Sequence, residues 1–219
     1  MHIILITMFS RSLIAIASCF LFFLAHVPGC SGQRRANLRN YRELTVAGLL
    51  TELSGTGGYD SNRLDFDILL SLVGAAGLND AVNGGLSGVT MFAPTDGAFF
   101  QLAREFGFSG DYNEEAVFGF LAALVENIAE GSLQENLEFL LSYHVALEAR
   151  SWRQLLNAGR VTTLCECYEI GIRRSRRRRR QLRILDDSVP HPSIVYQMSN
   201  YRVIGAFVHV INRVMIPPL

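Results

Sequence analysis

Residues 89–102 constrain the chain most, because an apolar run typical of a strand passes there directly into a helical pattern. Residues 89–92 are apolar or β-branched, which favours a buried strand, and Pro94 has no N–H to donate to a sheet, so the strand should end there. Thr95 or Asp96 can then cap the N-terminus of a helix. The residues that follow at helical spacing form one apolar face: Phe99, Leu102, Ala103 and Phe106.

The charge of the chain is balanced in total but unevenly distributed. Its 219 residues carry 20 basic and 20 acidic side chains, and every basic one is an arginine. Residues 43–169 hold 18 acids against 5 arginines, whereas residues 170–219 hold 10 arginines against 2 acids. The half-apolar composition predicts one folded domain rather than a disordered chain. The charge distribution indicates an acidic body with one basic segment, which either neutralises itself or binds an anionic partner.

The first 32 residues have the composition of a secretory signal peptide. Arg11 closes a short charged region, and the apolar run at 13–25 is shorter than the ~20 residues of a membrane span. We expect residues 1–32 to be a signal peptide and residues 33–43 to form a polar linker. Two alternatives remain open, which are an uncleaved N-terminal anchor and lipid attachment at Cys30.

The hydrophobic pattern changes its period about two thirds of the way along the chain. Leucine-rich runs at helical spacing predict helices at 43–53, 64–77, 78–82, 114–128 and 133–141. Short β-rich runs between turn residues then predict strands at 161–164, 168–172, 182–185, 193–198 and 203–210.

Three segments resemble the signatures of the fasciclin domain, an extracellular adhesion module. Residues 90–99 read TMFAPTDGAF, close to the usual TVFAPTDAAF, with Gly97 where Ala or Asn is common. Residues 140–145 read LLSYHV, and residues 208–217 read VHVINRVMIP, which is similar to the closing signature GVIHVIDRVLLP. No internal repeat occurs, so the resemblance indicates a single copy of the domain over residues 44–218.

The resemblance implies an α+β fold, in which an antiparallel β-sandwich or wedge carries an N-terminal helical layer. It also implies a secreted or surface-attached, non-enzymatic module of the extracellular matrix that binds matrix protein or acidic polysaccharide and needs no cofactor. Nucleic acid is not an expected partner, and a membrane would be contacted only through an uncleaved N-terminus. We expect structural roles for the matching signature residues, which are Thr90, Phe92, Ala93, Pro94, Thr95, Asp96, Phe99, His209 and Val210.

Tyr143 and His144 are the binding residues that the resemblance implies. They end an apolar helix, where both rings can pack while their polar atoms bond to the backbone. A catalytic His144 would need a nucleophile and an orienting acid, and no recognised motif supplies them. We therefore expect no enzyme. The alternatives are a purely structural component of an envelope or cell wall and, with less support, a hydrolase that uses His144.

The arginine run at 173–180 is the one feature that the resemblance does not explain. Its seven positive charges repel one another and resist burial, so we expect an exposed hairpin tip or loop inserted at 171–183. Three interpretations remain open: a site for an acidic glycan or other polyanion, a cleavage site for a protease of basic sequences, and a solvated insertion neutralised by the acidic body. The candidate polyanion contacts are Arg173, Arg174, Arg176, Arg177, Arg178, Arg179 and Arg180.

Cys165 and Cys167 form the remaining candidate for special chemistry. A zinc site would need further ligands, and His191 is the one nearby in sequence, so we expect no metal site. A disulfide between two cysteines so close in sequence would be strained, although export would permit it.

Overall fold

The structure is a computed structural model that describes residues 41–55, 58–128, 130–165, 168–176, 181–186 and 188–218. The described residues belong to one compact unit, Tyr41–Leu219. The predicted signal peptide, most of the predicted linker, Cys167 and the arginines 177–180 lie outside them.

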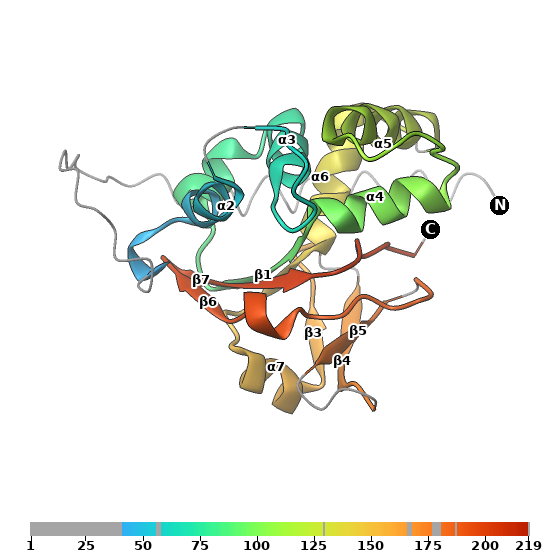
Figure 1. The fold of residues 1–219 in the computed structure, drawn as a ribbon. Coiled ribbons are helices and arrows are strands. Elements are labelled where there is room, and N and C mark those ends of the chain that lie inside the picture. The colour runs from blue at the N-terminus through green and yellow to red at the C-terminus, as the bar shows by residue number, and fades with distance from the viewer. Residues whose placement is uncertain are drawn as a thin grey trace, which may run out of the picture. The chain divides into compact units, whose positions relative to one another are not determined.

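The N-terminal half of the described chain is helical. Its elements are η1 (Tyr41–Glu43), α2 (Val46–Ser54), α3 (Asp67–Ala75), η2 (Ala81–Gly85), α4 (Asp96–Glu105), α5 (Glu114–Ile128) and α6 (Leu133–Tyr143). Figure 1 shows α2 to α5 gathered on one side of the β-sheets, with α6 running from this layer toward the strands. This arrangement is the helical layer that the resemblance implied.

Side chains at the helix ends explain where two of these helices begin. Thr95 precedes α4, and its Oγ1 accepts a hydrogen bond from Ala98 N at 3.3 Å. Ser132 and Glu135 form a reciprocal capping box at the start of α6. Helix α3 has no side-chain cap from its own N-terminal residue, and its first N–H groups bond to Asp96 of α4 instead.

Two sheets follow the helical layer. The four-stranded sheet has the order β2 (Val145–Leu147), β1 (Val89–Pro94), β7 (Ala206–Ile211) and β6 (Tyr201–Val203). The three-stranded sheet has the order β3 (Arg160–Thr162), β4 (Glu169–Arg174) and β5 (Leu182–Leu185). The α+β class is confirmed.

One strand pair departs from the antiparallel arrangement that was expected. β1 and β7 run parallel, with Val89 opposite Ala206 and Pro94 opposite Ile211, whereas the other ladders are antiparallel. A hairpin forces its strands to be antiparallel, but more than a hundred residues separate β1 from β7, so their relative direction is free of that constraint.

The core has two apolar clusters, one on each face of the four-stranded sheet. Met91, Ala93 and Val210 contribute to the cluster that includes the helical layer, whereas Phe92 and Ile211 contribute to the cluster that includes the three-stranded sheet. Every residue of β1 is buried. Since successive side chains of a strand alternate between its faces, burial on both faces explains the continuous apolar run of the sequence.

Two predicted strands differ from the structure. Residues 193–198 were predicted as one strand, but only isolated bridges form at Ser193 and Ile194, and residues 196–198 form the 3-10 helix η3 (Tyr196–Met198). The run 203–210 is interrupted after Val203 by a turn at Ile204 and Gly205, which divides it into β6 and β7. Gly205 has a φ of +71°, a conformation that costs glycine little.

Helix α7 (Trp152–Ala158) was not predicted. Its seven residues are too few to show a clear helical period, but Ser151 and Gln154 form a capping box whose spacing is visible in the sequence. Phe106 was placed on the apolar face of α4, and this was wrong, because it caps the end of that helix and is 47% exposed.

Candidate functional site

Tyr143 lies in the core rather than on the surface. Its side chain is 2% exposed and belongs to the cluster that contains Phe92. The ring meets the ring of Tyr168 edge to face, with 5.8 Å between the centroids. Tyr143 therefore supports the surface around it and does not form that surface.

His144 ends helix α6 and is 1% exposed. Its Nδ1 lies 2.8 Å from the carbonyl oxygen of Leu140, and its Nε2 lies 2.9 Å from Met215 N. Because a carbonyl accepts and an amide N–H donates, the ring is neutral and carries its proton on Nδ1. Burial lowers the pKa of His144 to about 4. The ring thus joins the end of α6 to the C-terminal segment.

His209 in β7 also forms hydrogen bonds to the backbone with both ring nitrogens, but here Nε2 faces the carbonyl oxygen and Nδ1 faces the amide. Its Nε2 lies 3.0 Å from the carbonyl oxygen of Arg150, and its Nδ1 accepts a hydrogen bond from Asn200 N at 3.2 Å. The ring is therefore neutral and protonated on Nε2. Burial lowers the pKa of His209 to about 4.

Both histidines bind backbone groups with both ring nitrogens. A general base needs a nitrogen within reach of its substrate, and the histidine of a hydrolytic triad is oriented by a carboxylate. The backbone already occupies each of these nitrogens. The geometry therefore gives the hydrolase alternative no support.

Thr90 and His209 both form hydrogen bonds with the backbone of the segment that connects β2 to α7. The hydroxyl of Thr90 donates to the carbonyl oxygen of Glu148 at 2.8 Å and accepts from Arg150 N at 2.8 Å. Since the carbonyl of Arg150 bonds to His209, two signature residues that are far apart in sequence hold the segment between β2 and α7. The other apolar or hydroxyl-bearing signature residues are also buried: Phe92, Ala93, Pro94, Thr95, Phe99 and Val210.

Asp96 and Gly97 of the first signature organise the start of α3. The Asp96 carboxylate accepts hydrogen bonds from Asp67 N and Ile68 N, each at 3.0 Å. Gly97 N donates to the carbonyl oxygen of Arg63 at 2.9 Å, and a Cβ at this position would lie 2.9 Å from the same oxygen. This close approach explains a glycine where the family commonly has a larger residue.

β4 and β5 form an antiparallel pair, and Arg173 and Arg174 of the arginine run end β4. We call these two strands, with the described arginines on and beside them, the basic hairpin. Arg173 lies opposite Arg183, and Arg174 lies opposite Leu182. Ile172 and Leu182 point into the core, so the strands are anchored, while Arg173 and Arg183 lie on the outer face. The exposed arginines of the described hairpin are Arg173, Arg174, Arg176 and Arg183.

The outer face of the three-stranded sheet continues this basic surface. Gly171 and Arg173 are two residues apart in β4, so they lie on the same face of the sheet. Arg160 of β3 lies opposite Gly171, and Arg183 of β5 lies opposite Arg173. The three arginines therefore share one face. Glu169 pairs with Arg160 at 3.4 Å. The ion pairs between described residues include neither Arg173 nor Arg183. Arg160 and Arg183 were not among the polyanion contacts predicted from the sequence. The pairing of β3 and β5 with β4 places them on this basic surface.

Two aromatic side chains flank the basic hairpin. The guanidinium of Arg174 lies 5.9 Å from the ring centroid of Trp152 in α7. The ring of Trp152 meets that of Tyr196 edge to face at 6.2 Å, and Tyr196 is 46% exposed. Both aromatics lie outside the arginine run in sequence, so no local pattern places them beside it.

A small pocket lies between α4 and the C-terminal segment. It has a volume of about 80 Å³ and is lined in part by Leu102, Pro190 and Ile216. Sites for small molecules usually have volumes of roughly 300–1,000 Å³. This pocket is therefore too small to serve as such a site.

The helical layer, the two sheets and the buried signature residues define an α+β domain of the fasciclin type. The fasciclin domain matches residues 64–217, well over half of the chain, and the protein therefore belongs to the fasciclin domain family. No protein with a curated description matches the chain. Among the described residues, none of the helices has both the length and the apolar character that a bilayer span requires.

A solved structure has a similar fold. It is a FAS1 domain pair from the insect cell adhesion molecule Fasciclin I, and it superimposes with a TM-score of 0.54 at 13% sequence identity. The match covers 80% of this chain and 51% of that one, so this chain spans about half the length of the pair. These values support the fold of a single fasciclin domain. The family match supports an adhesion-type module.

Proposed function

We propose that the protein is a secreted or surface-attached adhesion module that binds an acidic polysaccharide through its basic hairpin. The observation that carries this proposal is the exposed arginine surface of β3, β4 and β5. Like charges gathered on an otherwise acidic body create a local positive potential, which attracts a polyanion and orients it.

The chemistry of the hairpin fits repeating sulfate or carboxylate groups. A guanidinium is planar and binds such oxygens through two parallel hydrogen bonds, which makes arginine better suited to the task than a point charge. Arg173 and Arg183 lie on neighbouring strands, which are about 4.8 Å apart in a sheet, so both can meet one extended chain. Trp152 lies beside Arg174, whose side chain leaves β4 on the opposite face from Arg173, and its ring adds an apolar surface next to that charge.

A proteinaceous matrix partner at Tyr143 and His144 is the second candidate that the family relationship supplies. Because both side chains are buried, such a partner would contact the residues that cover them. The two remaining alternatives are a structural component without a discrete ligand and a cleavage site within the arginine run. Each of these gives a distinct result in the experiment below.

The test is the affinity of the purified full chain for heparin and for polygalacturonate, measured by calorimetry over a series of salt concentrations. We expect binding that weakens steeply as salt rises, because bound arginines release the counterions of the polyanion. Changing Arg173 and Arg183 to Ser should weaken binding at least about tenfold, since each removes charge-assisted hydrogen bonds. Changing Arg176 to Arg180 together to Ser should abolish it.

The matched control is the double variant Arg42→Ser and Arg202→Ser, which removes the same charge from exposed positions outside the hairpin. This variant should bind almost as the parent does. Equal loss in both double variants would mean that net charge alone attracts the glycan. Absence of binding to either glycan would reject the proposal, and gel analysis before and after secretion would then report cleavage at the arginine run.

The secreted location is tested by the N-terminal sequence of protein recovered from the medium of a secreting host. We expect a mature chain that begins near Gln33. A chain that still begins at Met1 and stays with the membrane fraction would support the anchor instead.

A further inference from the structure

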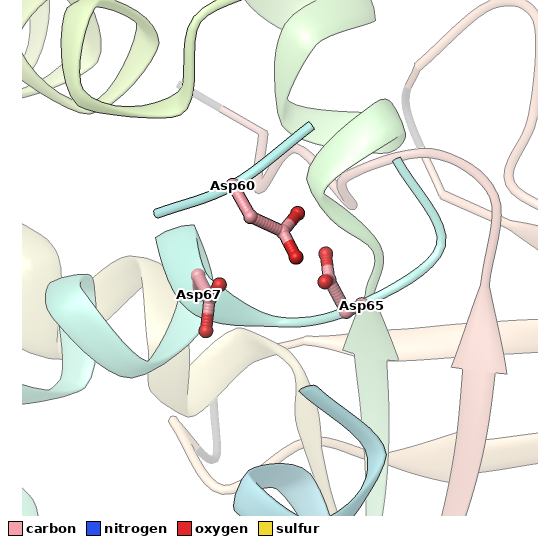
Figure 2. A group of neighbouring side chains, drawn as sticks. All are labelled: Asp60, Asp65 and Asp67. Atoms are coloured by element: carbon pink, nitrogen blue, oxygen red, sulfur yellow. The ribbon is translucent and has the colours of Figure 1, made fainter. Parts of the chain in front are cut away.

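Acidic side chains from three separate segments gather where α3, α4 and α5 begin. This acidic cluster consists of Asp60, Asp65, Asp67, Asp96 and Glu114. They form two groups that share Asp65, and within each group one carboxylate oxygen per residue lies within 4.8 Å of the others. Figure 2 shows the Asp60 and Asp65 carboxylates directed toward one another beside Asp67, at the first turn of α3.

Asp65 is the centre of the acidic cluster and the least satisfied of its members. Its side chain is 0% exposed, and neither of its carboxylate oxygens has a hydrogen-bond partner within the described part of the chain. Oδ2 of Asp67 is buried and lacks a partner in the same way. A buried ionised carboxylate is strongly unfavourable unless a donor or a cation compensates it.

The other buried members are held by neutral donors. Both oxygens of Asp96 accept from the first N–H groups of α3. Glu114 accepts from Asp60 N at 2.6 Å and from the hydroxyl of Tyr112 at 2.7 Å. These bonds fix the positions of the two carboxyl groups, each of which has an oxygen within 4.8 Å of an oxygen of Asp65.

No arginine neutralises the acidic cluster among the residues that the structure describes. The ion pairs found there involve four other acids: Glu105, Glu148, Glu169 and Asp186. The nearest basic residue in the same loop is Arg63, whose guanidinium instead lies over the rings of Phe100 and Tyr112, at 4.9 and 4.5 Å from their centroids.

The negative charge therefore has to be balanced by protons or by a metal ion. Burial, with further contributions from neighbouring carboxylates, raises the pKa of Asp65, Asp67 and Glu114, and that of Asp96 to about 9. One proton shared between Asp65 and Asp96 would relieve only part of this repulsion, because three other carboxylates would remain nearby: Asp60, Asp67 and Glu114.

We propose that Asp60, Asp65 and Asp67 bind a calcium ion, with Asp96 and Glu114 as the adjoining negative charges (Figure 2). Calcium prefers hard oxygen ligands at 2.3–2.6 Å, so oxygens on its opposite sides are about 5 Å apart, which the 4.8 Å separation permits. Asp60 is exposed, so water can complete the coordination from that side. Zinc would favour nitrogen and sulfur ligands.

This site goes beyond glycan binding and revises the expectation that the chain holds no metal. That expectation considered the cysteines, whereas the acidic cluster is assembled by the fold. Asp60, Asp65 and Asp67 do occur within eight residues of one another, and this spacing was the signal available in the sequence. The ion would join the loop before α3 to the first turn of that helix.

The test is thermal unfolding and calorimetric titration of the full chain after EDTA treatment, with calcium chloride added. We expect one saturable site and a rise in Tm of roughly 5–10 °C at a hundred times the dissociation constant. Sodium chloride at equal ionic strength should not reproduce this rise. An unchanged Tm and no heat of binding at millimolar calcium would overturn the proposal.

Two substitutions locate the ion. Asp60→Asn keeps an oxygen that can accept from Asn62 N, as Asp60 Oδ1 does, and should weaken calcium binding at least about tenfold without disturbing the fold. Asp65→Asn should abolish the calcium response while raising Tm in EDTA, because it removes a buried charge. Asp80→Asn, at an exposed acid elsewhere, is the control that should respond as the parent does. An undiminished response in Asp65→Asn would also overturn the assignment.

Discussion

The basic hairpin and the acidic cluster concentrate opposite charges in opposite surroundings. Figure 1 shows that β4 and β5 extend from one side of the four-stranded sheet, whereas α3, α4 and α5 lie on the other. The described arginines of the hairpin are exposed to water. Four of the five carboxylates in the acidic cluster are buried, with side chains no more than 5% exposed.

This difference decides what each group of charges requires. Water screens the exposed arginines, so they can remain unpaired at little cost and stay available to a partner. The buried carboxylates have lost water, so they need protons, donors or a cation in order to remain in the fold. Charge density alone therefore does not identify a binding site, and the burial of the charge determines the kind of ligand.

The largest effect should follow from removing a buried acid that accepts two hydrogen bonds. Asp96→Ala leaves Asp67 N and Ile68 N without acceptors at the start of α3, and should lower the free energy of unfolding by about 2–4 kcal/mol. Urea unfolding in EDTA measures this value. Asp96→Asn is the matched control, because its amide oxygen still accepts and its charge is removed. Substitutions at exposed sites usually change stability by no more than about 0.5 kcal/mol. A loss below that value in the alanine variant would contradict the proposed difference between the buried acids and the exposed arginines.

A second prediction concerns the pH dependence of stability that the buried side chain of His144 causes. The pKa of His144 is lowered to about 4 in the folded state, below the ordinary value of 6.5, so the unfolded chain binds more protons between these values. Its contribution to stability is therefore complete above pH 6.5 and is lost as the pH falls toward 4, at about 1.4 kcal/mol per pH unit.

Urea unfolding of the parent and of His144→Gln over pH 4–8 measures this contribution. The difference between the two chains isolates His144 from the acids, which titrate in both. A difference that does not change with pH would show that His144 titrates normally in the folded state.

The smallest expected change in stability concerns the exposed arginines of the basic hairpin. Arg173 and Arg183 lie directly opposite one another, so Arg183→Thr should raise the free energy of unfolding by about 0.2–1 kcal/mol through the loss of cross-strand repulsion. Arg202→Thr in β6, which lies opposite Phe207, should not produce this gain. Equal changes in the two variants would attribute the gain to the strand preference of threonine.

The sequence predicted the parts of the fold whose residues act locally. The apolar run at 89–93 with Pro94 marked a buried strand, and Thr95 marked the next helix, because each depends on its own side chain. Seven arginines in eight residues resist burial in almost any fold, so an exposed hairpin could also be expected.

The remainder depends on contacts that no local pattern contains. Asp96 caps α3 rather than its own helix, and Glu114 reaches the loop at Asp60 across more than fifty residues. Trp152 comes next to Arg174 only because α7 packs beside β4. Tyr143 and His144 were expected to be binding residues by resemblance, and that prediction stays untested, although both side chains are buried.

The most direct test of glycan binding at the basic hairpin uses the fluorescence of Trp152. This is the single tryptophan of the chain, and the guanidinium of Arg174 lies 5.9 Å from its ring centroid. Titration with heparin should change its emission saturably, the change should diminish as salt rises, and Arg173→Ser with Arg183→Ser should suppress it. Calorimetric binding of heparin that leaves the emission of Trp152 unchanged and is equally strong in this double variant would contradict contact at the hairpin and place the glycan elsewhere on the domain.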